Sequence, residues 1–359
     1  MKVAIVHYWL INMRGGEAVL SSLLEIFPDA DIYTHVYEPT KVTQQIRAKT
    51  VRTSFISKLP FAKKYYKYYL PLMPLALEQL DLTDYDLVIS SEAGPAKGVI
   101  TRPDALHICY CHSPMRYIWD MTWQYQQNTN IVIKWLMAPV LHYLRMWDQS
   151  SASRPDVIVA NSTFTQQRIR KFWGRDAMII HPPVAVADTE LVAPSTEYYV
   201  YAGELVGYKR GDLAVDAFNI NGRPLIVLGA GEELQRLESI ANSNITFIGR
   251  VDDDVFQRTL AGAKALIFPG VEDFGITPVE AISLQTPVIA FGRGGALDSI
   301  EEGKTGLFFY EQTIDAVNAA VNRFESLDLK ISAEYSKDIQ RQFSVDQFKM
   351  QFEKLVNSL

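Results

Sequence analysis

The sequence has few of the residues that build metal sites and disulfide frameworks. Its 359 residues include only two cysteines and six histidines. Cys109 and Cys111 alternate along an expected strand and are too close for an ordinary disulfide, which favours a reducing compartment. No pair of histidines or cysteines has the spacing of a zinc site. We therefore expect neither a disulfide framework nor a zinc centre.

Long hydrophobic runs are also missing. No apolar run reaches about 18 residues, so we expect no membrane-spanning helix. The opening segment MKVAIVHYWL has no long apolar core and no small-residue cleavage site, and we interpret it as a first strand rather than a signal peptide. No G-x-G-x-x-G motif follows this strand, which disfavours a dinucleotide-dependent dehydrogenase.

Acidic residues are unevenly distributed along the chain. Residues 1–180 carry 20 Lys and Arg against 15 Asp and Glu (net +5), whereas residues 181–359 carry 15 against 26 (net −11). The composition, 48% hydrophobic and 21% charged, is that of a soluble chain long enough for two domains. A basic half joined to an acidic half predicts different partners for each half.

The most informative stretch is GVEDFGITPVEA, residues 270–281, in which seven residues separate Glu272 from Glu280. A short buried strand is expected just before it and a helix just after it, with Thr277 as N-cap, Pro278 at the first helical position and Glu280 in the capping-box position. The loop thus follows the carboxyl end of a strand, which is where open α/β sheets bind ligands.

The residues of this loop suit a ligand that carries phosphate and hydroxyl groups. Gly275 lets a ligand approach the backbone, and the N-terminus of the following helix attracts an anion. Ionised Glu272 and Glu280 accept hydrogen bonds from hydroxyls. The alternative is that Glu280 only caps the helix and Glu272 is a solvated loop charge. A second strand, residues 287–291, leads into Gly292, Gly294 and Gly295 and repeats the strand–loop–helix pattern.

The two successive units, E-x7-E followed by a Gly-Gly loop, resemble the nucleotide-binding half of the retaining GT-B glycosyltransferases of group 1 (family four). Strands and helices alternate through both halves, which predicts an α/β fold with two parallel, doubly wound sheets. The resemblance implies a GT-B fold, in which two Rossmann-like domains face a central cleft. The expected boundaries are 1–183 for an acceptor-binding domain, 184–196 for a linker, 197–343 for a nucleotide-sugar domain, and 344–359 for a helix that crosses back.

The resemblance also implies roles for individual residues. Glu280 is expected to hold ribose hydroxyls, and Glu272 to hold the donor sugar. Lys209 and the Gly16 loop are expected to hold the diphosphate, although a Gly-Gly pair is also compatible with a plain tight turn. His112, in the string CHSPMRYIWD, is expected to contact the sugar near the anomeric centre. The catalytic residues expected are His112 and Glu272, and the donor-binding residues are Gly16, Lys209, Arg210, Arg250, Val251, Phe274, Gly275, Ile276, Thr277 and Glu280.

One position departs from the family pattern. The family usually has arginine after the first glycine of the second domain, whereas Glu204 follows Gly203 here. Arg210 is the substitute that we expect for this second phosphate-binding cation. Arg250 and Val251 lie where the nucleotide base usually meets the backbone.

The reaction that the resemblance implies is transfer of mannose from GDP-mannose to a hydroxyl of a lipid-linked oligosaccharide, in bacterial O-antigen, capsule or exopolysaccharide synthesis. Cationic side chains and helix N-termini replace a metal in such sites, so no metal cofactor is expected. We interpret the run Asp252 to Asp254 as a helix cap. The alternatives are a UDP-sugar-dependent glucosyl or galactosyl transferase of the same fold and a non-catalytic sugar-nucleotide-binding subunit.

Residues 55–80 combine basic and aromatic side chains. Lys58, Lys63, Lys64 and Lys67 alternate with tyrosines, a pattern typical of a membrane interface. We expect a peripheral protein on the inner face of the bacterial cytoplasmic membrane. The alternatives are a half-buried helix with its lysines in water and a nucleic-acid surface. The acidic second half and the absence of a nucleic-acid motif disfavour the latter.

Two further helices are expected in the first domain. The apolar segment 131–148 predicts a helix that is interrupted at Pro139. Residues 154–173 predict a strand and a helix, with Ser162 or Thr163 as the cap.

Overall fold

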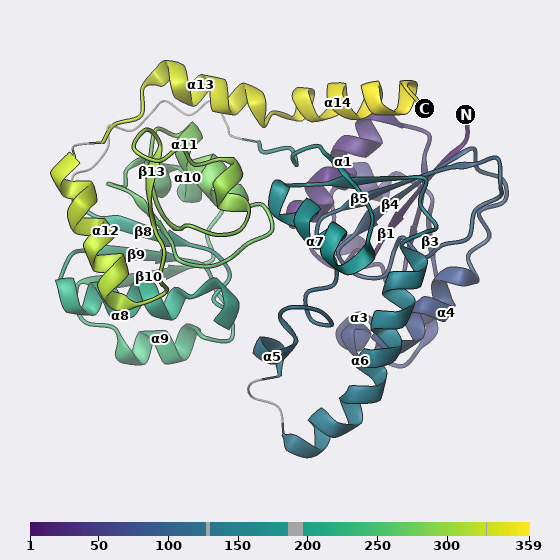
Figure 1. Ribbon diagram of the computed structural model, residues 1–359, viewed down its shortest axis with the longest axis horizontal. Helices are drawn as coiled ribbons and strands as arrows, with labels where there is room; N and C mark the ends of the chain where they lie inside the picture. Colours follow the sequence, from purple (N-terminus) through teal and green to yellow (C-terminus); the bar gives the residue numbers. More distant parts are fainter. Residues whose placement is uncertain (127–129, 186–196, 328) are drawn as a thin grey trace. The chain divides into compact units, whose positions relative to one another are not determined.

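The computed structural model describes residues 1–126, 130–185, 197–327 and 329–359. These residues form two α/β units, shown in Figure 1. Unit 1 contains Met1–Pro183 and Phe348–Leu359, and unit 2 contains Val184–Gln347. Residues 186–196 of the predicted linker lie outside the described residues.

Unit 1 is built on a seven-stranded sheet in the order β3-β2-β1-β4-β5-β6-β7, and every pairing is parallel. Its most central strands are near-continuous apolar runs because helices cover both faces of a parallel sheet. The strands are β1 (Val3–His7), β2 (Asp31–Thr34), β3 (Val51–Thr53), β4 (Leu87–Glu92), β5 (Leu106–Cys111), β6 (Val157–Ala160) and β7 (Met178–Ile179).

Alternate residues of β1 point to opposite faces and so define two cores. Val3 and Ile5 pack with α1 and α14, whereas Ala4 and Val6 pack with α4 and α6. The helices of unit 1 are α1 (Gly15–Ile26), η1 (Pro39–Lys41), α2 (Gln44–Arg47), η2 (Phe55–Lys58), α3 (Ala62–Tyr65), η3 (Tyr66–Leu72), α4 (Met73–Glu78), α5 (Thr122–Tyr125), α6 (Ile131–Ser151), α7 (Thr163–Trp173) and most of α14 (Val345–Asn357).

The last helix, α14, packs on unit 1 through one apolar face. Phe348, Phe352 and Leu355 are buried because the spacings of four and three residues place them on the same side of a helix. The Phe352 ring lies 6.5 Å from that of Phe27, which directly follows α1.

Unit 2 contains a six-stranded parallel sheet in the order β10-β9-β8-β11-β12-β13. This is the strand order of a dinucleotide-binding fold, and the predicted α/β, doubly wound arrangement is confirmed in both units. Its strands are β8 (Tyr199–Ala202), β9 (Leu225–Leu228), β10 (Ile245–Gly249), β11 (Leu266–Phe268), β12 (Val288–Phe291) and β13 (Gly306–Phe309).

Helices cover both faces of the unit 2 sheet. Buried side chains of α10, α11 and α13 belong to one core, and those of α8 and α12 belong to the other. The helices of unit 2 are η4 (Gly207–Lys209), α8 (Gly211–Asn221), α9 (Leu234–Ile240), α10 (Asp253–Ala261), α11 (Ile276–Ser283), η5 (Gly295–Asp298), α12 (Ile314–Leu327) and α13 (Ala333–Gln342). Within the described residues, no helix is both long enough and apolar enough to cross a membrane.

The predicted start of α11 is wrong. Gly275, not Thr277, is the N-cap, and its φ of 89° is one that glycine adopts without strain. The helix therefore begins two residues earlier than expected, and Pro278 occupies its third position rather than its first. Glu280 lies beyond the capping-box position, so it does not cap the helix.

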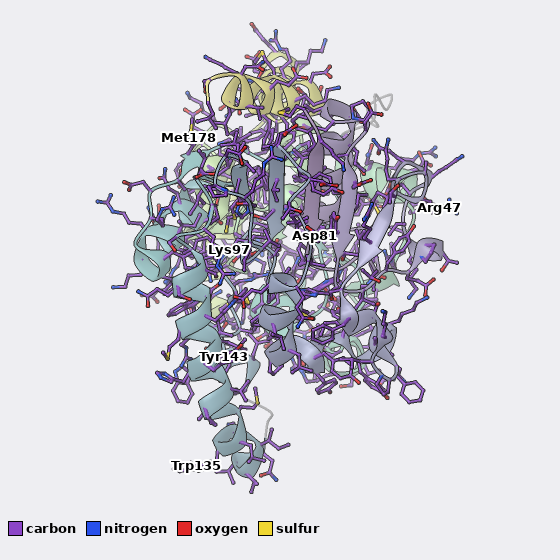
Figure 2. The ribbon with its side chains drawn as sticks, turned by 90° about the vertical axis from the view of Figure 1, so that its right-hand side faces the viewer. Arg47, Asp81, Lys97, Trp135, Tyr143 and Met178 are labelled. Atoms are coloured by element: carbon purple, nitrogen blue, oxygen red, sulfur yellow. The ribbon has the colours of Figure 1, made fainter. Side chains whose placement is uncertain are left out.

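The predicted interruption at Pro139 is also wrong, since α6 runs through it as one helix. Figure 2 shows the continuous helix between the labelled Trp135 and Tyr143. The proline removes only one backbone donor, and the residues beyond it are held by the buried side chains of Leu141 and Leu144.

Two predicted caps are confirmed. The Ser162 side chain accepts a hydrogen bond from the Thr165 backbone N–H at 2.9 Å and so caps α7. The Asp252 carboxylate accepts one from the Val255 N–H at 2.9 Å and caps α10. Within the acidic run, Asp254 pairs with Arg258 at 2.9 Å. Asp252 and Asp254 are thus engaged by helix α10 itself.

Candidate active site

The predicted site residues gather at the carboxyl edges of the two sheets. In each sheet, the strand order reverses beside the first strand, between β1 and β4 in unit 1 and between β8 and β11 in unit 2. Ligands of open α/β folds bind outside the carboxyl ends at such a reversal. His112 and Gly16 belong to unit 1 and the other predicted donor residues to unit 2, so each group is described within its own unit.

In unit 2, Lys209 and Glu272 meet across the strand reversal. Lys209 ends η4, which follows β8, and Glu272 follows β11. The lysine Nζ lies 2.9 Å from Glu272 Oε1, and the side chains are 18% and 22% exposed. Burial alone would lower the pKa of Lys209, but the charge and hydrogen bond of Glu272, together with Tyr208 and Glu204, outweigh it and the lysine pKa is raised. Lys209 therefore stays positively charged at neutral pH.

Glycines bring the backbones of this edge into close contact. A Cβ on Gly270 would lie 2.8 Å from Lys209 Cα, and one on Gly295 would lie 2.3 Å from Phe274 Cα. The Gly295 N–H also donates a hydrogen bond of 2.9 Å to the carbonyl of Glu272. The glycine loop after β12 therefore packs directly on the loop that carries Glu272 and holds it in place.

The segment between Glu272 and α11 offers backbone donors. Phe274 is buried, and its ring lies 5.6 Å from that of Phe343, which fixes the loop to the core of unit 2. The N–H groups of Ile276 and Thr277 belong to the first turn of α11, where no carbonyl of the same helix can accept them. Together with the helix dipole, they form a site that attracts negative charge.

Glu280 differs from Glu272 in that its carboxylate has no partner in the described part of the chain. Among the residues that the structure describes, no group forms a hydrogen bond or ion pair with the Glu280 side chain. Burial raises the pKa of this carboxyl to about 7, and the nearby Asp253 adds to the shift. A carboxylate in this state is stabilised by any ligand that donates hydroxyl hydrogen bonds to it.

Arg210, Arg250 and Val251, the remaining predicted donor residues of unit 2, make their described contacts with other residues than Lys209 and Glu272. Arg210 has a φ of 55° and directs its Nε to Asp212 Oδ1 at 3.1 Å. Arg250 is exposed in the loop after β10, and Val251 packs on one core of unit 2.

In unit 1, His112 belongs to a chain of polar side chains at the ends of three adjacent strands. Its Nε2 lies 2.8 Å from Ser91 Oγ, and that hydroxyl lies 2.9 Å from His7 Nδ1. His7 Nε2 lies 3.5 Å from Glu17 Oε1, at the outer limit of a hydrogen bond, and the contact is an ion pair only when the imidazole is protonated. His7, Ser91 and Glu17 were not identified from the sequence, although His7 ends β1 as Cys111 ends β5, and Ser91 is the next-to-last residue of β4.

The shared hydroxyl couples the two imidazoles. Burial lowers the pKa of His112 to about 3, and His7 adds to the shift, so the ring is neutral at physiological pH. Ser91 has one proton to donate, so it can donate to only one of the two rings and must accept from the other. The tautomer of His112 is therefore linked to that of His7.

Gly16 lies on the same edge, at the start of α1. A Cβ at Gly16 would lie 2.3 Å from the Tyr8 hydroxyl, so glycine leaves the space that this phenol occupies. The Tyr8 ring also lies 6.2 Å from the ring of His112. Gly16 and His112 thus both lie next to Tyr8, a residue that was not identified from the sequence.

The predicted membrane lysines lie on η2, α3 and η3. Lys63 pairs with Glu38 at 3.0 Å, and Lys64 lies 5.2 Å from the centre of the Tyr65 ring. Lys67 lies 5.9 Å from the centre of the Tyr66 ring, and Lys58 is exposed. All four lysines are exposed, which fits both a solvated structural face and a lipid surface.

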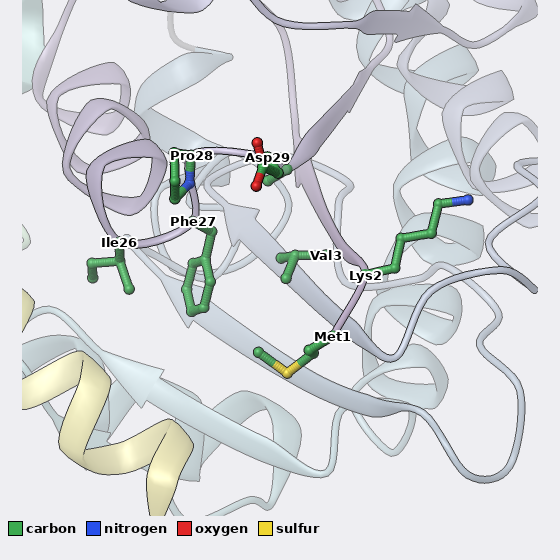
Figure 3. Close-up of a pocket in the computed structure, with 8 residues that line it drawn as sticks. Met1, Lys2, Val3, Ile26, Phe27, Pro28 and Asp29 are labelled. Atoms are coloured by element: carbon green, nitrogen blue, oxygen red, sulfur yellow. The ribbon is translucent and has the colours of Figure 1, made fainter.

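A pocket lies at the opposite, amino edge of the unit 1 sheet. It is lined by the start of β1 and the segment after α1, including Phe27 and Asp29. Figure 3 shows Lys2 extending away from the other lining side chains. This edge is not the one at which α/β sheets bind ligands, and the pocket contains none of the predicted site residues.

Comparison with known proteins agrees with this fold. Residues 13–188 match the family described as Glycosyltransferase Family 4, and residues 188–342 match Glycosyl transferases group 1. A GDP-mannose-dependent alpha-(1-6)-phosphatidylinositol monomannoside mannosyltransferase of Mycobacterium tuberculosis is 27% identical over 224 residues, which cover 53% of this chain and 57% of the relative. The alpha-1,3/1,6-mannosyltransferase ALG2 of Saccharomyces cerevisiae is 24% identical, over 55% of this chain and 48% of the relative.

The chain therefore spans about half the length of these curated relatives. Among solved structures, Anabaena HepE in complex with UDP and glucose has a TM-score of 0.72 at 15% identity, with 100% of both chains covered. At that identity, the likeness shows the fold.

Proposed function

The chain belongs to the group 1 glycosyltransferases of the GT-B fold, and we propose that it transfers mannose from GDP-mannose to a hydroxyl of a lipid-linked oligosaccharide. The proposed setting is the synthesis of a bacterial surface polysaccharide, at the inner face of the cytoplasmic membrane. The names of the mycobacterial and yeast relatives, both mannosyltransferases, support mannose as the transferred sugar.

The observation that carries this proposal is the pair Lys209–Glu272, together with Glu280 of the helix that follows, which has no partner among the described residues. A nucleotide sugar has a diphosphate, a sugar and a ribose diol, and this edge offers a cation, a carboxylate and a second carboxylate. Lys209 and the N-terminus of α11 balance the diphosphate charge. Glu280 accepts hydrogen bonds from the ribose hydroxyls, and Glu272 accepts them from the donor sugar.

The proposed reaction retains the configuration at the anomeric carbon. The bond from that carbon to the diphosphate oxygen breaks, and a bond to the acceptor oxygen forms on the same face of the sugar. The acceptor proton passes to the leaving phosphate. Lys209 stabilises the charge that develops on the leaving group, which is the largest contribution a preorganised cation can make.

In unit 1, neutral His112 contacts a hydroxyl of the donor sugar near the reacting carbon. The Ser91 hydroxyl fixes the orientation of the ring through Nε2, which leaves Nδ1 for the sugar. Gly16 allows the backbone at the start of α1 to approach the diphosphate. The exposed lysines of residues 58–67 meet the lipid headgroups near the acceptor.

The proposed mechanism uses cationic side chains in place of a metal. We therefore expect activity to survive excess EDTA, since Lys209 and the helix N-terminus supply the positive charge. The measurement is GDP release from GDP-mannose with and without chelator. Loss of activity that magnesium or manganese restores would contradict the mechanism.

A donor screen tests the function directly. GDP-mannose, other GDP-sugars and UDP-sugars are each incubated with the protein, and release of nucleoside diphosphate is measured. We expect GDP-mannose to be hydrolysed fastest. Faster turnover of a UDP-hexose would favour the glucosyl or galactosyl alternative. We include UDP-sugars because the Anabaena HepE structure is a complex with UDP and glucose. Tight binding without turnover of any donor would identify a sugar-nucleotide-binding subunit.

A further inference from the structure

Helix α6 buries one face along its second half and is mostly exposed along its first half. Leu141, Leu144 and Trp147 pack in a core of unit 1. The exposed large apolar side chains of the first half are Ile131 (66% exposed), Val132 (61%), Ile133 (50%), Trp135 (75%) and Leu136 (69%). Figures 1 and 2 show this half extending beyond the other elements of unit 1, with Trp135 near its end.

These side chains do not form the narrow stripe of a surface helix. Successive residues turn by about 100° in an α-helix, so the five exposed apolar residues extend over more than half of its circumference. A helix that is apolar on most sides is normally covered by protein or lipid. Lys134 is the one charged residue of the stretch 131–139.

The second half anchors the exposed half firmly. Asp148 of α6 forms an ion pair with buried Lys97 and accepts 2.7 Å hydrogen bonds from the indole N–H groups of Trp119 and Trp173. At the other end, the Asn130 side chain accepts a hydrogen bond of 2.9 Å from the Val132 N–H and caps the helix. The exposed apolar turns are therefore a regular, capped extension of a fixed helix.

The charges around these turns match an anionic lipid surface. Residues 121–147 contain no Asp or Glu and carry Lys134 and Arg145. Trp123 and Tyr125 are 78% and 48% exposed. Exposed tryptophan and tyrosine beside cations, without acidic residues, are typical of a membrane–water interface. Dimerisation through an apolar surface would not require this absence of acidic residues.

The lysine-rich stretch lies beside α6 in the same unit. Leu77 of α4 packs in the same core as Leu141 and Leu144, which joins the segment 55–80 to α6. Phe61 and Tyr68 of this segment are 78% and 80% exposed. The apolar turns thus continue a surface that already carries exposed aromatic and basic side chains.

We propose that residues 131–139 of α6 insert into the headgroup and upper acyl region of an anionic bilayer. Nine helical residues extend about 13 Å, less than half of the roughly 30 Å hydrocarbon core, so the helix enters one leaflet only. Apolar side chains on most sides favour insertion by the end of the helix rather than along one face. This proposal deepens the membrane contact of the proposed function and is independent of the donor and the reaction.

The test is flotation with vesicles of phosphatidylcholine containing 30% phosphatidylglycerol, at low and high salt. Apolar insertion resists salt, whereas adsorption through lysines does not. We expect wild type to keep part of its binding at high salt. Trp135→Ser/Leu136→Ser should reduce that part roughly tenfold or more. The matched control is Ile220→Ser in unit 2, since Ile220 is 69% exposed, as Leu136 is.

Replacing Lys58, Lys63, Lys64 and Lys67 with Ser should remove mainly the salt-sensitive part of the vesicle binding.

A label reports insertion directly. The native Cys109 and Cys111 are buried, so Leu136→Cys offers an accessible thiol for an environment-sensitive fluorophore. We expect a blue shift with anionic vesicles and quenching by lipids labelled high on the acyl chain. The same label at Ile220→Cys should respond to neither.

The outcomes separate this proposal from the donor assignment. Trp135 and Leu136 lie outside the proposed donor residues, so donor hydrolysis without vesicles should be unchanged in the double variant. Flotation that is lost entirely at high salt, or a label at position 136 that stays in water, would overturn insertion even if donor hydrolysis is normal. A wild-type dimer that the double variant abolishes, without vesicle binding, would assign the surface to a second copy of this chain.

Discussion

The two sheets share a strand order, but the side chains at their carboxyl edges differ in charge. At the carboxyl edge of unit 2, Lys209 and Glu272 are ion-paired and Glu280 has a pKa of about 7. At the corresponding edge of unit 1, His112 and His7 share the Ser91 hydroxyl, and His112 is neutral. The topology places polar side chains at both strand reversals. Burial and partners then decide whether an edge suits a charged phosphate or neutral hydroxyls.

The largest effect is expected from removing the cation of unit 2. Lys209→Ala should lower kcat/KM with the donor roughly 10²–10³-fold, because the charge that develops on the leaving diphosphate loses its preorganised partner. Calorimetry should show a larger loss of affinity for GDP than for guanosine. The matched control is Lys264→Ala, which removes a lysine of the same unit that pairs with Glu325 at 3.1 Å. Unchanged GDP binding by Lys209→Ala would mean that the diphosphate lies elsewhere.

The glycine contacts of unit 2 come next. Gly295→Ala places a Cβ 2.3 Å from the Cα of Phe274, which cannot rotate away. We expect a loss of about 1–3 kcal/mol of stability, together with weaker donor binding, since the Glu272 loop must shift. Gly207→Ala is the control, because a Cβ there meets nothing within 4 Å. Equal melting temperatures for the two variants would show that the loops separate easily.

Much of this architecture could be predicted from the sequence because it depends on local patterns. Buried parallel strands appear as short apolar runs, and the residues that follow them lie at one edge. The meeting of Lys209 with Glu272 follows from that rule. The cap of α7 was narrowed to Ser162 or Thr163 and that of α10 to the run Asp252–Asp254, because a cap depends on residues three positions away.

The parts that could not be predicted depend on contacts between distant residues or on backbone angles. The chain from His7 through Ser91 to His112 requires β1, β4 and β5 to be neighbours, and the two hydrogen bonds cross 84 and 21 residues of sequence. The true start of α11 depends on the φ of Gly275. Packing beyond Pro139 kept α6 continuous, against the usual effect of an internal proline.

The Glu280 carboxyl of unit 2 titrates near neutral pH, so the stability of the protein should depend on pH through this residue. The Glu280 carboxyl has a pKa of about 7 in the folded protein against an ordinary value of 4.5, so protonation favours the folded state. This contribution to stability is complete below pH 4.5 and is lost as the pH rises through 7. Glu280→Gln should therefore exceed wild type in stability by about 1–3 kcal/mol at pH 8, with little difference near pH 4.5, in urea unfolding.

Protonation of Glu280 stabilises the folded protein but should weaken nucleotide binding. Ribose hydroxyls donate to the ionised carboxylate, so GDP affinity of wild type should fall as the pH decreases below 7, by up to about tenfold per unit. Glu280→Gln should bind GDP more weakly and without this slope. His112→Gln should keep the slope, because His112 stays neutral over this range. A slope that survives in Glu280→Gln would place the titrating group elsewhere.

The smallest effect is expected at the neutral edge of unit 1. Ser91→Ala removes the hydroxyl that links His112 to His7, and we expect kcat/KM to fall about two- to tenfold, the value of one hydrogen bond. Ser90→Ala is a matched control, since Ser90 Oγ lies 2.9 Å from Nε2 of His107, another buried histidine. Both variants lose a buried serine–histidine contact and should lose similar stability. Only Ser91→Ala frees the tautomer of His112, so only it should lower activity. Equal activities in the two variants would mean that Ser91 is a packing residue and that His112 orients itself without the chain to His7.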